Sequence, residues 1–202
     1  MVSLMFRTAS LLLMIPVALI ACDPAPAPAA APTASTAANA NSATPNAAAI
    51  PSATAETDAL VGKPAPDFTA TAHDGFSVKP SLLTGKYVVV YFYPKDETPG
   101  CTKEACAFRD AWKPLESKGV VLVGISSDTI ESHKQFAEHH KLPFHLVSDA
   151  DGSIAAAFGV PNRGGMLGRQ SFVIGPDGRI TNVYRTVDVT KHADEILRDV
   201  SH

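Results

Sequence analysis

The chain has 202 residues and a formal net charge of -3 at pH 7. Its Lys and Arg residues are scattered rather than clustered, so the charge pattern gives no basic footprint for nucleic acid. Hydrophobic residues make up 46% of the sequence, no repeat of fixed period is visible, and no Gly-rich phosphate loop follows a strand.

The front end resembles an export signal. Arg7 precedes an apolar run from Leu11 to Ala21 that is interrupted by Pro16. The run is too short for a comfortable membrane span of about 20 residues. We therefore expect residues 1–21 to be a signal peptide, with an uncleaved anchor as the alternative.

The end of this signal, Leu19-Ile20-Ala21-Cys22, resembles a bacterial lipobox. In a lipobox, cleavage before the cysteine leaves that cysteine to carry lipid, so Cys22 is the expected attachment site. The resemblance implies a lipid-anchored protein on the periplasmic side of a bacterial membrane, and Asp23 resembles the signal that retains many lipoproteins at the inner membrane. An ordinary cleaved signal, with Cys22 incidental, is the alternative.

A linker follows the signal. From Pro24 to Ala55 the chain is almost entirely Ala, Pro, Ser, Thr and Asn, which cannot bury a core. Its scattered prolines argue against a long helix and favour extended conformations. We expect residues 22–58 to be a disordered, semi-stiff spacer and residues 59–202 to be a single domain.

The pattern of the domain predicts an α/β protein. Asp67 to Ala72 and Phe76 to Val78 read as an N-terminal β-hairpin, and Tyr87 to Tyr93 reads as a strand buried on both faces. Helices and strands then alternate, which fits a thioredoxin-like sandwich with a central mixed sheet flanked by helices. The expected later elements are helices at 102–112, 129–140, 153–158 and 191–200, and strands at 120–126, 144–147, 170–174 and 180–184.

One cysteine of the domain lies where a reactive thiolate is stable. Pro99 and Gly100 break the first buried strand, and Cys101 follows at the mouth of the next helix, which has Glu104 in its first turn. A helix N-terminus offers unpaired N–H groups and the positive end of the helix dipole, both of which stabilise a thiolate. Cys106 lies five residues further on.

These residues resemble the active site of a peroxiredoxin. Pro94, Thr98 and Cys101 match the family pattern Pro-x-x-x-Thr-x-x-Cys. Cys106 matches the resolving cysteine of the peroxiredoxin Q, or bacterioferritin-comigratory, subfamily. The resemblance extends through GKPAPDFTA and GRQSFVIGPDG to nearly all of the domain, and it implies the same thioredoxin-like fold.

The resemblance implies a thiol-dependent peroxidase. Cys101 would attack hydrogen peroxide or an organic hydroperoxide, and the resulting sulfenic acid would form an intramolecular disulfide with Cys106. A thioredoxin-like dithiol would reduce that disulfide. The resemblance further implies that no metal or organic cofactor is needed and that the protein is a monomer.

The resemblance also assigns supporting roles. It implies that the Thr98 hydroxyl binds both the thiolate and the peroxide. It also implies that Pro94 shields the cysteine, since proline has no N–H that competes for the oxidant. Arg169 matches the arginine that lies against the thiolate. Arg163 is the competing candidate, and Glu104 is expected to orient an arginine or to cap the helix.

The cysteine spacing predicts motion. In an intact helix, residues five apart have Cα atoms about 8–9 Å apart, whereas a disulfide needs Cα atoms within about 7 Å. The helix must therefore unwind locally before Cys101 and Cys106 can join, unless a break in the helix lies between them.

Three alternatives remain. A tethered copper-delivery protein of thioredoxin fold would pair the cysteines with a distant histidine, for which His139, His140 and His145 are candidates, although such proteins use Cys-x-x-x-Cys. A thiol-disulfide exchange protein would use Cys-x-x-Cys, which is absent. A purely structural disulfide between Cys101 and Cys106 is the third, and peroxide consumption by the reduced protein would exclude it.

Overall fold

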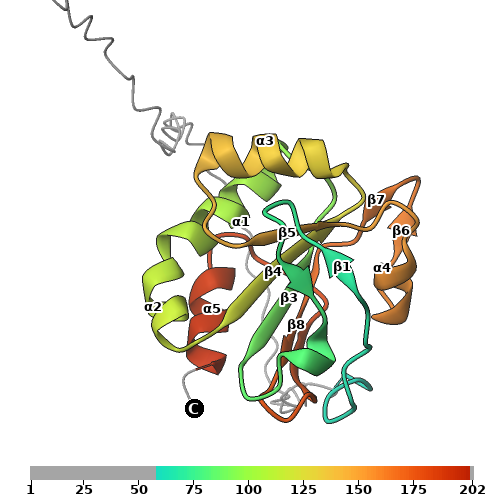
Figure 1. The fold of residues 1–202 in the computed structure, drawn as a ribbon, viewed down its shortest axis with the longest axis vertical. Helices are drawn as coiled ribbons and strands as arrows, with labels where there is room; N and C mark the ends of the chain where they lie inside the picture. The colour runs from blue at the N-terminus through green and yellow to red at the C-terminus, as the bar shows by residue number, and fades with distance from the viewer. Residues whose placement is uncertain (1–57, 201–202) are drawn as a thin grey trace, which may run out of the picture. The chain divides into compact units, whose positions relative to one another are not determined.

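A five-stranded mixed sheet lies at the centre of the computed structural model, which describes residues 58–200. The strand order is β5-β4-β3-β8-β9 (Figure 1). The central strand β3 (Val88–Phe92) pairs in parallel with β4 (Val121–Ser126) and antiparallel with β8 (Gln170–Ile174). The sheet is completed by β5 (His145–Ser148) beside β4 and by β9 (Ile180–Tyr184) beside β8.

Every residue of β3 and β4 is buried, because the sheet is covered on both faces. Side chains alternate between the faces along each strand. Val89, Tyr91 and Tyr93 therefore enter one core, and Val88 and Val90 enter the other.

One face of the sheet packs against helices, and we call its core the helix-side core. It includes Phe108 of α1, Phe136 of α3 and Ile196 of α5. The covering elements are α1 (Pro99–Asp110), α2 (Trp112–Ser117), α3 (Ile130–His140) and α5 (His192–Asp199).

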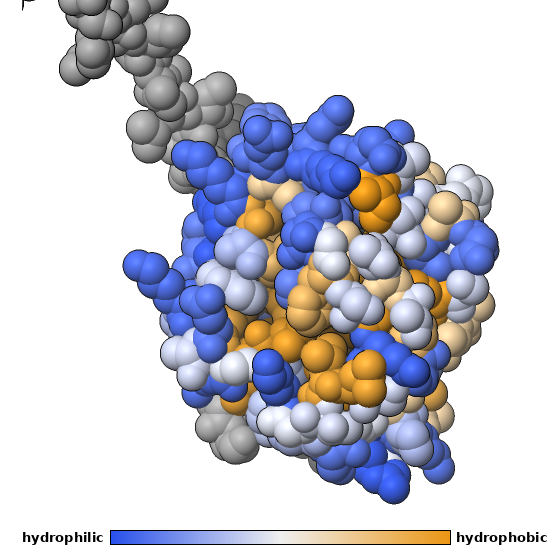
Figure 2. Space-filling model, in the orientation of Figure 1, coloured by the Kyte–Doolittle hydropathy of each residue, from blue (hydrophilic) through white to orange (hydrophobic). Residues whose placement is uncertain are grey.

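The other face packs against a short hairpin and a short helix, and we call its core the hairpin-side core. It includes Val78, Phe158 and Phe172. The elements on this side are β1 (Ala70–Thr71), β2 (Ser77–Val78) and α4 (Ser153–Ala157). Figure 2 shows much apolar surface on the face that presents the hairpin, and Leu82 is 76% exposed.

The thioredoxin-like fold and the antiparallel N-terminal hairpin are confirmed. The expected start of the cysteine helix was wrong, because α1 begins at Pro99 rather than Thr102. A proline fits the first helical position, where its missing N–H would have had no partner. Glu104 consequently lies beyond the first turn of α1, and Trp112 opens the separate helix α2.

Besides α2, three small elements were not anticipated: the 3-10 helix η1 (Pro80–Leu82) and the hairpin strands β6 (Asn162–Arg163) and β7 (Met166–Leu167). Within residues 58–200, no helix has the length and apolarity needed to cross a membrane. The signal peptide, Cys22, Asp23 and the linker lie outside the described residues.

Candidate active site

Cys101 occupies the first turn of α1, just beyond the end of β3. Thr98 is the N-cap residue, and Pro99, Gly100 and Cys101 are the first three residues of the helix. The N–H of Cys101 is thus among the first four of the helix, which have no intrahelical carbonyl to bind. The side chain is only 2% exposed, so the sulfur meets the positive end of the helix dipole in a largely dry setting.

Arg169 reaches this sulfur from the residue just before β8. Its Nη2 donates to Cys101 Sγ at 3.1 Å, and its Nη1 donates to Glu104 Oε2 in an ion pair. The guanidinium also lies against the start of α1, since a Cβ at Gly100 would be in ordinary van der Waals contact with Nη2, at 3.5 Å. Arg163, the competing candidate, is exposed in β6. The catalytic role of Arg169 stays a prediction, but of the two arginines it is the one beside the sulfur.

Burial and charge shift the pKa values of Arg169 and Glu104 in opposite directions. Burial raises the pKa of Glu104 to about 7, although the Arg169 charge and hydrogen bond oppose this. Burial by itself would lower the pKa of Arg169, but the Glu104 charge and the hydrogen bond to Cys101 raise it overall. Arg169 therefore stays a cation, and a cation in contact with sulfur favours thiolate over thiol.

The loop before α1 holds the other two residues of the motif. Pro94 is half-buried and follows the buried end of β3. Thr98 Oγ1 donates to the carbonyl of Lys95 at 3.0 Å, which ties the loop to itself just ahead of the helix. A role for Thr98 in peroxide binding stays a prediction.

A buried carboxylate, missed at the sequence level, anchors this loop to α3. Asp96 accepts hydrogen bonds from Tyr93 Oη at 2.7 Å and Ser132 Oγ at 2.7 Å, and it contacts His133 Nδ1 at 2.9 Å. Burial would raise the pKa of Asp96, but His133 and the hydroxyl donors lower it overall. An Asp in a polar loop gives no sequence signal for burial, because its donors come from residues far along the chain.

Both cysteines lie in the same continuous helix. Cys106 is buried in α1, and no disulfide joins it to Cys101. The alternative that a helix break separates the two residues is therefore wrong. The spacing of about 8–9 Å between their Cα atoms in an α-helix applies, so α1 must unwind locally before a disulfide can form.

The buried residues Ser171 and His192 were also missed. His192 Nε2 and Ser171 Oγ lie 2.8 Å apart, and burial together with the Arg169 charge lowers the pKa of His192 to about 4. His192 is therefore neutral at pH 7. Its position at the start of α5 reads like a surface residue in the sequence, and only the packing of α5 on α1 buries it.

The histidines considered for copper delivery have other partners than the cysteines. His145 bonds to Asp74 at 2.8 Å and stacks on Phe76, while His139 and His140 contact Glu97. Within residues 58–200, no group of three possible metal ligands includes a cysteine. The copper-delivery alternative therefore has no ligand set in this part of the chain.

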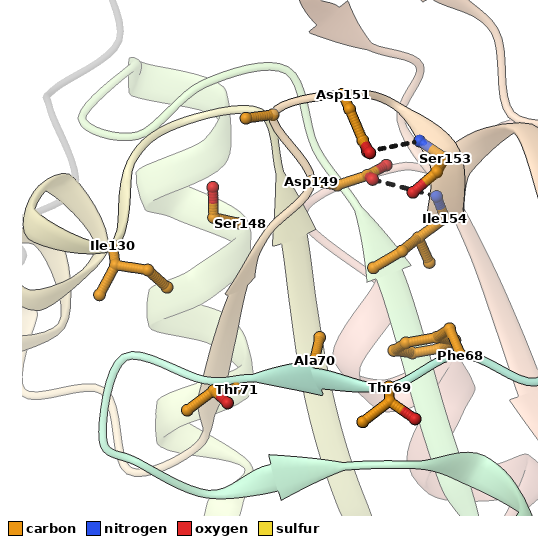
Figure 3. A pocket seen from close by; sticks show the side chains of 11 residues that line it. Phe68, Thr69, Ala70, Thr71, Ile130, Ser148, Asp149, Asp151, Ser153 and Ile154 are labelled. Carbon is orange, nitrogen blue, oxygen red and sulfur yellow. Dashed lines mark hydrogen bonds between the residues drawn. The ribbon is translucent and has the colours of Figure 1, made fainter.

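A surface pocket elsewhere on the molecule is separate from the sulfur (Figure 3). It is lined by β1 and the residues just before it, by the chain from the end of β5 to the start of α4, and by Ile130 of α3, and it includes neither Cys101 nor Arg169. One of its walls is stiffened by Asp149, whose carboxylate accepts the backbone N–H groups of Ile154 and Ala155 at 3.0 and 2.8 Å. This carboxylate thus supports the start of α4.

A cysteine in the first helical turn, on a thioredoxin-like sheet and with an arginine on its sulfur, defines a thiol enzyme. The AhpC/TSA family model matches residues 61–183. A putative peroxiredoxin bcp of Coxiella burnetii is 43% identical over 144 residues, which make up 68% of this chain and 95% of that protein. The chain belongs to the AhpC/TSA family, and it is a thiol-dependent peroxidase of the peroxiredoxin Q and bcp type.

Solved structures agree with this assignment. Peroxidoxin BcpB from Mycobacterium tuberculosis is similar with a TM-score of 0.64 at 35% identity, over 70% of this chain and 96% of that one. The bacterioferritin comigratory protein of Xanthomonas campestris, studied for its alkyl peroxide reduction activity, gives a TM-score of 0.61 at 31% identity, over 66% of this chain and 89% of that one. The copper-delivery and thiol-exchange alternatives are not favoured.

Proposed function

We propose that Cys101 is the peroxidatic cysteine of this peroxidase and Cys106 its resolving cysteine. The contact of 3.1 Å between Arg169 Nη2 and Cys101 Sγ carries the proposal. It places a fixed cation on a thiol that also lies in the first turn of a helix. Glu104 holds the other arm of the guanidinium and so orients Arg169 as a positioning residue.

The first step moves two electrons from sulfur to peroxide. The Cys101 thiolate attacks the terminal oxygen of a hydroperoxide, the one that carries the hydrogen, so that the O–O bond breaks and an S–O bond forms. The departing oxygen takes up a proton and leaves as water or an alcohol, while Cys101 becomes a sulfenic acid. Arg169 stabilises negative charge on the oxygens as the bond breaks, with Thr98 as a further donor and Pro94 as a shield for the sulfur.

The second step closes the disulfide. After α1 unwinds, the Cys106 thiol attacks the sulfenic sulfur of Cys101, water leaves, and an S–S bond forms within one chain. A thioredoxin-like dithiol then reduces this bond and is itself oxidised to a disulfide. The cycle operates in a monomer and uses no metal or organic cofactor.

Stopped-flow peroxide reduction followed by mass spectrometry of the cysteines tests these assignments. Cys101→Ser should abolish peroxide consumption. Cys106→Ser should consume one equivalent and then stall as a sulfenic acid that is open to further oxidation. Full turnover by Cys106→Ser with a dithiol donor would overturn the resolving role, and retained consumption by Cys101→Ser would overturn the peroxidatic one.

We also propose that the enzyme is attached by lipid at Cys22 to the periplasmic side of a bacterial membrane, with Asp23 favouring the inner membrane. The lipobox-like residues before Cys22 and the uncharged stretch from Pro24 to Ala55 support this proposal. Cys22→Ser should move the protein from the membrane to the soluble fraction. Continued fractionation of that variant with membranes in high salt would rule out lipid at this residue.

A further inference from the structure

Two histidines at the end of α3 meet a glutamate of the active-site loop. His139 Nδ1 lies 3.1 Å from Glu97 Oε1, and His140 Nε2 lies 3.0 Å from Glu97 Oε2. All three potential ligand atoms fall within 4.8 Å of one another. The side chains of His139 and Glu97 are about half exposed and that of His140 is 12% exposed, so the group is accessible from solvent.

Two imidazoles and one carboxylate form a recognised ligand set for a divalent transition metal. Zn²⁺ binds imidazole nitrogen and carboxylate oxygen at about 2.0–2.2 Å, usually with four ligands in a tetrahedron. Neighbouring ligand atoms in such a tetrahedron lie about 3.4 Å apart. Each imidazole nitrogen already lies close to this distance from one oxygen of Glu97, His139 from Oε1 and His140 from Oε2. Because one ligand atom from each residue lies within 4.8 Å of the others, small rotations of these side chains bring three ligands to this spacing and leave a fourth position for water.

The backbone also holds Glu97 in place for this role. Glu97 adopts a left-handed conformation with φ of 59°, which is uncommon for a residue other than glycine. Its neighbour Asp96 is anchored to α3 through Ser132 and His133. The carboxylate is thus carried by a fixed loop and directed along α3 toward the two histidines.

We propose that Glu97, His139 and His140 bind one divalent transition-metal ion of the zinc class. The site includes neither cysteine, so it differs from a copper-delivery centre that uses the thiols. It lies at the entrance to α1, because Thr98 follows Glu97 directly and is the N-cap of that helix. Arg109 in the last turn of α1 donates to the carbonyl of His140 at 3.0 Å, so the end of α3 contacts both the entrance and the last turn of α1.

An ion at this site would fasten the loop before α1 to the end of α3. If Cys101 and Cys106 have the roles proposed above, on which this consequence rests, disulfide formation requires α1 to unwind next to the clamped loop. Bound metal then slows disulfide formation and leaves the attack of Cys101 on peroxide unchanged. The sulfenic acid would persist longer and be more open to further oxidation.

Calorimetric titration with ZnCl₂ tests binding without reference to activity. The full chain is used with all three cysteines replaced by Ser, so that thiolates do not bind the ion. We expect one saturable equivalent, and His139→Ala or Glu97→Gln should weaken it at least about 10-fold, since even loss of an outer-shell partner of a metal site has that effect. His145→Ala, which changes a histidine outside the group, is the matched control and should bind as the parent does. Equal binding by His139→Ala and the parent, or no saturable binding below about 1 mM, would overturn the site.

Stopped-flow kinetics test the clamp separately, with the cysteines intact. Zn²⁺ should slow disulfide formation several-fold in the unmodified chain and have little effect in His139→Ala. Equal slowing in both proteins would show that the ion acts at the thiols, and the clamp would be wrong. A chain that binds Zn²⁺ in calorimetry but never oxidises Cys101 would instead disprove the peroxidatic role while leaving the metal site in place.

Discussion

The two faces of the central sheet are built from the same strands but differ in what they bury. The hairpin side buries mainly apolar side chains such as Phe172, and the carboxylate of its buried Asp149 is satisfied by two backbone N–H groups. The helix side buries several ionisable groups close together, including Glu104 of α1, His133 of α3 and His192 of α5. The difference comes mainly from the covering elements, because Glu104, His133 and His192 all belong to helices.

Four buried polar side-chain atoms have no hydrogen-bond partner within residues 58–200, and all come from elements of the helix side. They are Tyr91 Oη, Glu104 Oε1, His133 Nε2 and His192 Nδ1. A buried polar atom without a partner costs about 1–3 kcal/mol. The helix side therefore accepts unfavourable burial around the reactive thiol, although both faces bury apolar cores of similar extent. Four predictions test this difference between the faces.

The largest effect on stability is expected from Phe172→Ala in the hairpin-side core. Phe172 packs on Phe92 and Phe158 with ring centroids 5.8 and 4.9 Å apart. Its truncation should lower the free energy of unfolding by about 3–5 kcal/mol, as large core deletions do, in urea denaturation. The rate of peroxide attack per folded molecule should stay within about twofold of the parent, since nothing at the sulfur changes. A large loss of that rate would show that the two faces are not independent.

The largest effect on chemistry is expected from Arg169→Ala. Loss of a positioned donor beside developing charge lowers a rate by about 100-fold or more, and stopped-flow oxidation of Cys101 would measure this. Arg163→Ala is the matched control, because Arg163 is exposed in β6 and should change the rate little. A greater defect in Arg163→Ala than in Arg169→Ala would show that the wrong arginine has been assigned to the sulfur.

Glu104 predicts a pH dependence of stability. Burial raises its pKa from 4.5 to about 7, so between these values the folded state binds more protons than the unfolded state. The Glu104 contribution to stability must then fall as the pH rises through this range, by about 1–3 kcal/mol between pH 5 and 8. Buried His192, whose pKa is lowered from 6.5 to about 4, contributes with the opposite sign, so the test compares the parent with Glu104→Gln, which cannot ionise: between the two pH values the parent should lose stability relative to the variant in denaturation experiments. A decline of equal size in the variant would assign the effect to other groups.

Local patterns predicted the strands and the main motif because both depend on neighbouring residues. The apolar run from Tyr87 to Tyr93 and the turn Pro176-Asp177-Gly178 each contain their own signal, and β8 and β9 were predicted at their observed bounds. The start of α1 was misplaced because Pro99 and Gly100 look like breakers, although proline is favoured at a first helical position. Whether a proline breaks a helix or begins one depends on tertiary packing, which cannot be read from the neighbouring residues.

The residues of the candidate site could likewise be predicted where they form a local pattern, and could not be predicted where only the fold brings them together. Cys101, Cys106, Thr98 and Pro94 form a compact pattern, and Arg169 could be named only through the family resemblance, since it lies 68 positions from the cysteine it contacts. The Asp96 network and the pair His192–Ser171 carry no such pattern. They exist because α3 and α5 pack onto the sheet, and their spacing along the chain gives no hint of contact.

The smallest expected effect is that of Tyr91→Phe, which is compared with Tyr93→Phe. Tyr91 lies in β3, Tyr93 directly follows this strand, and both side chains enter the helix-side core. Tyr93 Oη donates to Asp96 at 2.7 Å, whereas Tyr91 Oη is buried without a partner within the described residues. Tyr93→Phe removes a hydrogen bond to a charged group and should lower the free energy of unfolding by about 1.5–3 kcal/mol. Tyr91→Phe removes only an unsatisfied hydroxyl and should leave that free energy unchanged or raise it by about 1 kcal/mol. Both variants keep the ring and its contact with Phe108 or Phe136, so urea denaturation of the pair isolates the hydroxyl groups. If Tyr91→Phe proved as destabilising as Tyr93→Phe, the Tyr91 hydroxyl would have to be satisfied in solution, and the helix side would bear less unfavourable burial than these atoms indicate.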